Sequence, residues 1–125
     1  MTKRDPINPT DDDARALAQD LLHQARFGAL AVSHPETGAP YVARVAMLWA
    51  DGALLTLSST LSLHTKALQA SPFCAALIGE PGDKGDPLTH PRITLICHAE
   101  LADKTAFKSR WLSAIPKAKL YYDFT

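Results

Sequence analysis

Apolar and polar positions follow two periods along this chain, one typical of helices and one typical of strands. Between residues 11 and 25 the apolar side chains recur three or four positions apart, which places them on one stripe of a helix. Thr10 followed by Asp13 resembles an N-cap with its reciprocal acidic residue, and Gly28 is a stop signal. We therefore predict a helix over residues 11–25, preceded by a loose polar arm over residues 1–9.

Shorter apolar segments separated by turn residues are typical of strands. We predict five of them, over residues 27–33, 41–50, 53–59, 73–78 and 92–101. Asp51-Gly52 favours a type I′ hairpin turn, so the first three strands form an antiparallel meander. Further helices are predicted over 61–70 and 103–113, with a last short one from Pro116 toward Tyr121. Residues 79–91 contain three prolines and three glycines and are predicted to be an irregular loop.

These elements predict a mainly β domain, a small antiparallel barrel with helical caps. A length of 125 residues suits a single domain spanning the whole chain. The strand over 41–50 has apolar side chains on both faces, which predicts that both faces are covered. One face carries Tyr41, Val45, Met47 and Trp49; the other carries Val42, Ala46 and Leu48 together with Arg44. Because the chain is short, we expect a second copy to form one of the covering layers, in a homodimer.

Composition excludes several classes of function. The 13 basic and 13 acidic residues cancel, so no overall field favours nucleic acid or an anionic membrane as partner. The polar start is no signal peptide, and no apolar run approaches the ~20 residues that cross a bilayer. Cys74 and Cys97 lack metal-site or redox-motif spacing and are expected to be buried, reduced thiols. We therefore expect a cytoplasmic protein.

Hydroxyl side chains gather where the third predicted strand gives way to a helix. They belong to Ser58, Ser59, Thr60, Ser62 and Thr65, with Lys66 close behind. Hydroxyls, exposed helix N–H groups and a cation suit a phosphate group. The alternative is that these hydroxyls only cap the helix, which a single residue would accomplish.

Arg44 is the sharper clue because it interrupts an otherwise apolar strand. A charged group in a covered strand costs roughly several kcal/mol unless it meets an anion or a carboxylate. From the residues alone, an anion ligand and a structural salt bridge are equal alternatives, and Asp51 is the acid nearest in sequence.

An ordered series of segments over residues 13–124 carries a family resemblance. The segments are ARALAQDLLHQARFGALAV, GAPYVARVAMLW, LLTLSSTLSLHTKALQASP, GDPLTHPRITLICHAEL and YYDF. Together they resemble the FMN-binding split-barrel proteins related to pyridoxamine 5′-phosphate oxidase, and within them the branch of bacterial haem-utilisation oxygenases. The resemblance implies a dimer with FMN bound at the subunit interface.

The resemblance also implies a role for particular residues. Arg44 matches the arginine that reaches the flavin phosphate, and Val45, Ala46 and Met47 match the segment whose backbone follows the flavin rings. Ser59 and Thr60 match a pair that binds the ribityl-phosphate tail. The phosphate-holding start of the next helix corresponds to His64, Thr65 and Lys66, and Arg92 is implied to approach from the partner subunit.

Departures from the family pattern limit the activity that is expected. The chain has no arginine-rich C-terminal substrate segment, so it is not expected to be a true pyridoxamine 5′-phosphate oxidase. Cys97-His98 stands where many relatives have Gly-Arg. The family continues past the YYDF segment into another barrel strand, and its haem-degrading members carry their haem-ligating histidine there; here we expect both to be missing after Thr125.

The expectation is therefore a flavoprotein whose chemistry, if it is an enzyme, is FMN-dependent oxidation or reduction of a small substrate, with no catalytic residue assigned. The alternatives are a haem-binding or haem-utilisation protein of the same fold, and a dimeric remnant without cofactor. A metal site is not expected because the histidines and cysteines lack ligand spacing, and Cys97 and His98 point to opposite faces of a strand.

Overall fold

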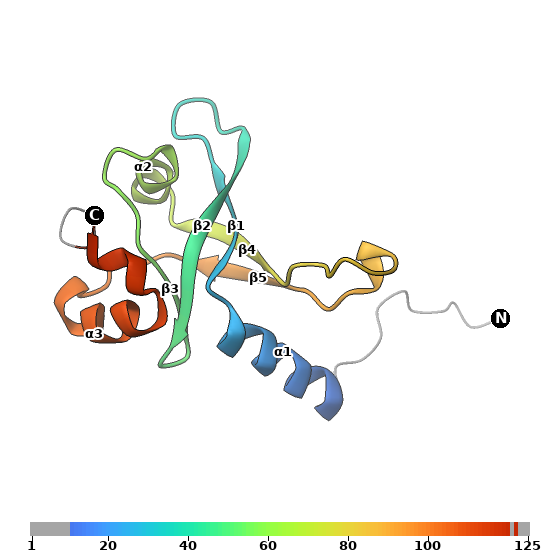
Figure 1. Ribbon diagram of the computed structural model, residues 1–125. Coiled ribbons are helices and arrows are strands. Elements are labelled where there is room, and N and C mark those ends of the chain that lie inside the picture. Colours follow the sequence, from blue (N-terminus) through green and yellow to red (C-terminus); the bar gives the residue numbers. More distant parts are fainter. Residues whose placement is uncertain (1–10, 121, 123–125) are drawn as a thin grey trace.

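The computed structural model of the chain describes residues 11–120 and residue 122 (Figure 1). The predicted arm over residues 1–9, Thr10, and most of the closing YYDF segment lie outside these described residues. The helices are α1 (Asp12–Gln24), α2 (Leu63–Ala70) and α3 (Lys104–Ala114), with two short 3₁₀ segments, η1 (Pro87–Thr89) and η2 (Pro116–Leu120). The strands are β1 (Phe27–Ser33), β2 (Pro40–Ala50), β3 (Ala53–Thr56), β4 (Phe73–Ile78) and β5 (Ile93–His98).

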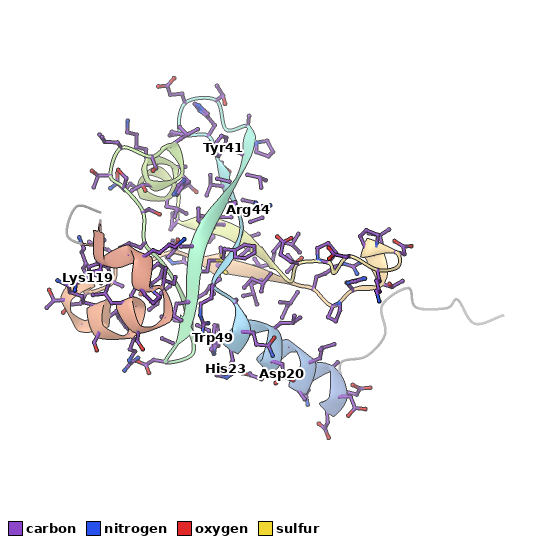
Figure 2. The ribbon with its side chains drawn as sticks, in the orientation of Figure 1. Asp20, His23, Tyr41, Arg44, Trp49 and Lys119 are labelled. Atoms are coloured by element: carbon purple, nitrogen blue, oxygen red, sulfur yellow. The ribbon has the colours of Figure 1, made fainter. Side chains whose placement is uncertain are left out.

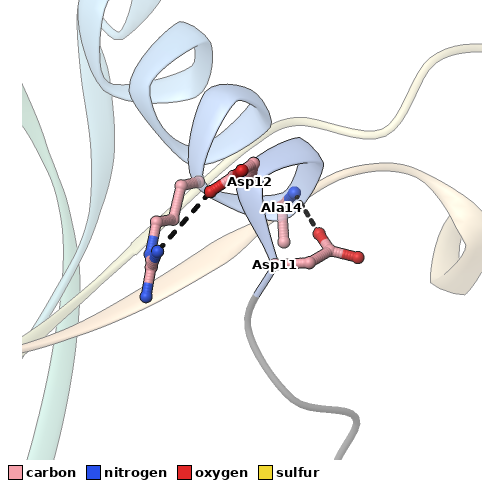
Figure 3. Close-up of polar contacts among 4 residues, drawn as sticks. Asp11, Asp12 and Ala14 are labelled. Atoms are coloured by element: carbon pink, nitrogen blue, oxygen red, sulfur yellow. Dashed lines mark hydrogen bonds and ion pairs between the residues drawn. The ribbon is translucent and has the colours of Figure 1, made fainter.

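The predicted helix at the start of the chain is confirmed, but its predicted cap is wrong. The N-cap residue is Asp11 rather than Thr10, and its carboxylate accepts a hydrogen bond from the Ala14 N–H at 2.8 Å (Figure 3). An aspartate suits this position because it satisfies a first-turn N–H and places negative charge at the positive end of the helix. Asp12 forms an exposed ion pair with Arg15 at 3.7 Å.

Gly28 does not end α1, contrary to expectation. The helix ends at Gln24, and the Ala25 N–H closes it by donating to the carbonyl groups of Leu21 and Leu22. Gly28 instead lies in β1, where an added Cβ would be 2.8 Å from the sulfur of Met47. The glycine is needed for close packing.

The five strands form one antiparallel sheet in the order β3-β2-β1-β4-β5. The meander of β1, β2 and β3 is confirmed, with β4 added on the free side of β1 and β5 at the far edge. Asp51 and Gly52 both have positive φ, 52° and 74°, as the predicted type I′ turn requires. The sheet curls into an open half-barrel with helices around it (Figure 1), which confirms the predicted antiparallel barrel with helical caps.

Two strands are shorter than predicted. β3 ends at Thr56, whose hydroxyl donates a hydrogen bond of 2.8 Å to the Ala46 carbonyl. This carbonyl lies opposite the residue that follows Thr56, so the side chain takes the acceptor that would have continued the strand pairing. Consequently Ser58 and Ser59 lie outside the strand. β5 ends at His98. The next residue, Ala99, lies opposite Pro72 and donates to its carbonyl, but Pro72 has no N–H with which to donate to Ala99.

Buried side chains lie on both faces of the curled sheet. The larger cluster is packed between the sheet and α1 and α2; its buried members are Leu22, Ala25, Leu30, Val32, Val45, Met47, Ala67, Ala76 and Ile78. The smaller cluster joins Leu48 of β2 to α3 and η2 through Trp111, Ala118 and Tyr122. Part of β2 is thus covered on both faces, as predicted. The other part is not, because Val42 is 62% exposed within one chain.

Candidate cofactor site

The predicted phosphate-binding residues lie at the amino end of α2. After β3 the chain turns at Ser59, whose hydroxyl accepts from the Leu61 N–H at 3.1 Å while its carbonyl accepts from the Ser62 N–H at 3.1 Å. Thr60 is exposed at this turn. Ser62 occupies the N-cap position but forms no side-chain hydrogen bond to the helix. The reading of these hydroxyls as simple caps is therefore not supported, since the first-turn N–H groups of α2 receive no side-chain acceptor.

Two further polar groups sit at the same end of α2. The Ser58 hydroxyl and His64 Nε2 form a half-buried hydrogen bond of 3.0 Å, and burial lowers the pKa of His64, so the imidazole is neutral at pH 7. The Thr65 hydroxyl oxygen is buried and lacks a hydrogen-bond partner. Such an orphaned group is uncommon in a folded protein. Together with exposed Lys66, this helix end is suited to an anion with several acceptor oxygens.

Arg44 is exposed within one chain. The expected free-energy cost of burying its charge therefore does not arise there. Its side chain is 77% exposed, and its guanidinium lies 5.8 Å from the centre of the Phe27 ring and forms an ion pair of 3.9 Å with Glu80. Asp51 pairs instead with Arg110 at 2.5 Å. The structural salt bridge considered as an alternative therefore exists, but it is long and solvated.

One chain does not bring all the predicted residues into contact. Arg44 lies on the same face of β2 as Val42, whereas α2 packs through Ala67 against the opposite face. No hydrogen bond or ion pair among residues 11–120 links Arg44 to Ser59, Thr60, Thr65 or Lys66. Figure 2 shows Arg44 near the middle of β2.

The segment expected to follow the flavin rings is the centre of β2. The side chains of Val45 and Met47 are buried in the larger cluster, and Ala46 packs against the smaller one. The Met47 N–H donates to the Arg26 carbonyl at 2.9 Å, and the Ala46 carbonyl accepts from Thr56. Packing in both clusters therefore fixes the direction of this segment.

Arg92 precedes β5 and lies on the loop over residues 79–92. Its guanidinium donates to the carbonyl groups of Leu88 at 2.5 Å and His90 at 3.3 Å. Figure 1 shows this loop extending to the side of the molecule away from α2. Within one chain Arg92 is therefore not part of the α2 site, which is compatible with its expected approach from a partner.

An open apolar face covers much of the sheet on the side of Arg44. Its exposed members are Phe27, Val42, Phe73, Leu77 and Ile96, and between them a shallow hollow of about 180 Å³ is lined by small side chains such as Ala29, Ala31 and Ala75. The strand register places these residues on one face because side chains alternate along each strand. An apolar surface of this extent on one sheet face is typical of an interaction or ligand site.

Sequence reasoning missed Glu80 and the open face. Glu80 is remote from Arg44 in sequence, and only the pairing of β1 with both β2 and β4 makes them neighbours. The open face left a signal, since Thr94, Ile96 and His98 alternate with core-facing residues in β5. Ile96 lies between two polar residues on its face of the strand, so without the register the sequence does not show whether that face is buried or open.

Neither a metal-binding group nor a membrane-spanning helix occurs within the described residues. Across residues 11–120, no three His, Cys, Asp or Glu side chains are grouped so that they could hold a metal ion. In the same part of the chain no helix has the length and apolarity to cross a membrane.

Comparison with known proteins gives related sequences and structures. No protein-family model matches the chain. It is 40% identical over 79 residues to the chloroplastic non-canonical heme oxygenase HOZ of Arabidopsis thaliana, a match that spans 60% of this chain and 23% of that protein. A heme-binding protein from Mycobacterium smegmatis is 27% identical with a TM-score of 0.78, over 95% of this chain and 49% of the other. The chain thus spans about a quarter and about half of these two relatives.

Further solved structures share the fold. One is 41% identical with a TM-score of 0.79, over 91% of this chain and 78% of its own. An F420 reductase, 23% identical, has a TM-score of 0.61 over 78% of this chain and 75% of its own. A FAD-binding protein from Mesorhizobium loti, 20% identical, has a TM-score of 0.59 over 84% and 72%. The fold is therefore the split-barrel fold that flavin- and haem-binding proteins use, which fits the expected resemblance to the proteins related to pyridoxamine 5′-phosphate oxidase.

Proposed function

We propose that this protein is a homodimeric flavoprotein that binds FMN through its phosphate at the amino end of α2. The observation that carries the proposal is the uncapped start of this helix, with the buried, unpartnered hydroxyl of Thr65 beside it. Phosphate oxygens would accept from the free helix N–H groups and from the Thr65 hydroxyl, and Lys66 would supply a positive charge. Ser59 and Thr60 border the same turn.

Of His64 and Arg44, only Arg44 would add positive charge near the phosphate. Neutral His64 is held by Ser58, so it adds no positive charge at pH 7 and offers only its second ring nitrogen to a ligand. Arg44 lies on the face of β2 away from α2 of its own chain, so it would meet the phosphate only across the proposed dimer interface. It is exposed and only loosely paired with Glu80, so its side chain can turn at little cost. Val45, Ala46 and Met47 form the part of β2 along which the flavin rings would lie.

The open apolar face supports the homodimer. A second copy laid against Val42, Leu77 and Ile96 would remove apolar surface from water, which favours association. It would also bring Arg92 of the second copy toward the first, as the family resemblance implies. FMN would then supply hydride or electron transfer to a small substrate, while the protein positions the phosphate and shields the rings.

The test is a titration of the purified full chain with FMN, followed by the quenching of flavin fluorescence, together with sedimentation analysis. We expect Arg44→Ala and Lys66→Ala to weaken FMN binding by roughly ten-fold or more, since hydrogen bonds to charged groups contribute about 1.5–3 kcal/mol. Ser58→Ala, which removes a contact of His64 but no predicted phosphate ligand, is the matched control and should have a smaller effect. A dimer that does not bind excess FMN would refute the proposal and leave a cofactor-free remnant.

A second candidate function is haem binding, and one residue favours it. His98 lies on the open apolar face, with its ring edge-on to Phe73 at 5.3 Å between centroids. Among the described histidines, His34, His64 and His90 use ring nitrogens in hydrogen bonds, whereas the rings of His23 and His98 make none, and of these two only His98 lies on the open apolar face. An apolar surface with an accessible imidazole suits a haem group. The similarity to haem proteins points the same way.

Haem titration separates the two candidates. If His98 ligates the iron, the wild-type chain develops a Soret band and His98→Ala loses or shifts it. His23→Ala changes a histidine on the exposed surface of α1 and should leave the band unchanged (Figure 2). A band that is the same in both variants would argue against the His98 site.

A further inference from the structure

Cys74 of β4 and Cys97 of β5 face each other across the two strands at one edge of the sheet. Their Cα atoms are direct partners in the antiparallel register, between the pairs Phe73–His98 and Ala75–Ile96. Both cysteines are free thiols and half-buried. Because Ile96 and His98 point to the open face, the two thiols lie together on the core side of the sheet.

The hydrogen-bond pattern identifies the kind of cross-strand pair. The Ala99 N–H donates to the Pro72 carbonyl at 2.8 Å, so these two residues occupy a hydrogen-bonded position. Hydrogen-bonded and non-hydrogen-bonded pairs alternate along antiparallel strands. Cys74 and Cys97, two positions away, therefore form a hydrogen-bonded pair. Cα atoms at such a pair are about 5.5 Å apart, within the range of roughly 4.4–6.8 Å that a disulfide spans.

The same geometry makes a disulfide here strained. In antiparallel sheets the Cβ atoms of directly opposite residues are roughly 4.5–5.5 Å apart, and hydrogen-bonded pairs have the larger separations. A relaxed disulfide needs a Cβ–Cβ distance of about 3.5–4.5 Å. Strained disulfides are reduced more readily than relaxed ones, and they are typical of labile, regulatory bonds.

We propose that Cys74 and Cys97 form a reversible dithiol–disulfide pair that responds to small-molecule disulfides and crosslinks the edge strand β5 to β4. One cysteine thiolate attacks a sulfur of oxidised glutathione, which gives a mixed disulfide and releases one glutathione thiolate. The other cysteine thiolate attacks the protein sulfur of that mixed disulfide and releases the second glutathione. Two electrons and two protons pass from the two protein thiols to one molecule of oxidised glutathione, which becomes two molecules of reduced glutathione. This site is independent of the flavin proposal.

The electrostatics of the two thiols agree with their proximity. Burial raises the pKa of both, and interaction with Cys97 raises that of Cys74 further. Since the thiolate is the attacking species, oxidation is slow at neutral pH, which suits a response to sustained oxidising conditions.

The experiment incubates the full chain with oxidised glutathione, alkylates the remaining thiols and determines the intact mass and the crosslinked peptides. We expect loss of two hydrogen atoms in the monomeric chain, a Cys74–Cys97 peptide, and reversal by excess reduced glutathione. In the single variants Cys74→Ser and Cys97→Ser, the remaining cysteine should instead form a mixed disulfide with glutathione or stay a free thiol. The double variant Cys97→Ala/His98→Cys keeps two thiols but places them on opposite faces, and should form no internal crosslink.

Two results would overturn the proposal. One is a wild-type chain in which both thiols stay open to alkylation or end only as mixed or intermolecular disulfides. The other is an internal crosslink that forms equally in the double variant. If a variant does not fold by circular dichroism, hydrogen exchange of the wild type decides instead: β5 amides should exchange more slowly after oxidation, and unchanged exchange would contradict the crosslink.

Discussion

The ion pair between Arg44 and Glu80 allows a quantitative test of the proposed phosphate site. Glu80 pairs with the Arg44 guanidinium at a separation of 3.9 Å between Nη2 and Oε1, so in the proposed dimer it would compete with the phosphate for this group. Both side chains are mostly exposed, 77% and 58%, so the interaction is that of charges in water. Two unit charges at this separation interact by about 1 kcal/mol. Glu80→Gln should therefore strengthen FMN binding by roughly five-fold.

The assay is the FMN titration repeated at low and high salt. The gain should shrink at high ionic strength because exposed charges are screened. Stability should change by less than about 1 kcal/mol, since exposed ion pairs contribute little. Glu100→Gln makes the same change of net charge at another exposed position and is the matched control. An equal gain in Glu100→Gln, or a gain that persists in Arg44→Ala/Glu80→Gln, would show that Glu80 does not act through Arg44.

Three further predictions concern packing, assembly and pH. Gly28→Ala places a methyl group 2.8 Å from the Met47 sulfur and 2.9 Å from the Leu77 carbonyl oxygen, and should lower the free energy of unfolding by about 1–3 kcal/mol; an unchanged urea midpoint would contradict this packing. Val42→Glu places a charge on the open face and should dissociate the proposed dimer in sedimentation while the monomer stays folded; an intact dimer would mean that another face is used. Burial lowers the pKa of His64 in the folded state, so its contribution to stability is complete above about pH 6.5 and is lost as the pH falls through the folded pKa. His64→Gln should flatten thermal stability over that range, and parallel curves would exclude this role.

The sequence predicted the elements well where local chemistry decides them. The stripe of apolar residues gave α1, the Asp51-Gly52 dipeptide gave the turn between β2 and β3, and alternation gave the strands. Errors occurred where a contact distant in sequence ends an element. The hydroxyl of Thr56 ends β3 by bonding to Ala46, and nothing in residues 53–59 announces it.

The candidate site divides in the same way. The run of hydroxyls ahead of Lys66 could be predicted to be a site for an anion because that prediction needs only the residue types and their position before a helix. The environment of Arg44 could not be predicted, because the burial of its side chain depends on what packs over β2. The structure leaves its side chain exposed beside Glu80 and on the face away from α2.

By itself, then, the sequence determined the secondary structure, the antiparallel barrel class and the residue types at the amino end of α2, since each depends on neighbours within a few positions. Tertiary structure decided which face of the sheet stays open, which acid meets Arg44, and that Cys74 lies opposite Cys97. These follow from the register of β1 with β2 and β4 and of β4 with β5. A shift of one residue would move every side chain to the other face, and that register is set by packing of the whole curled sheet.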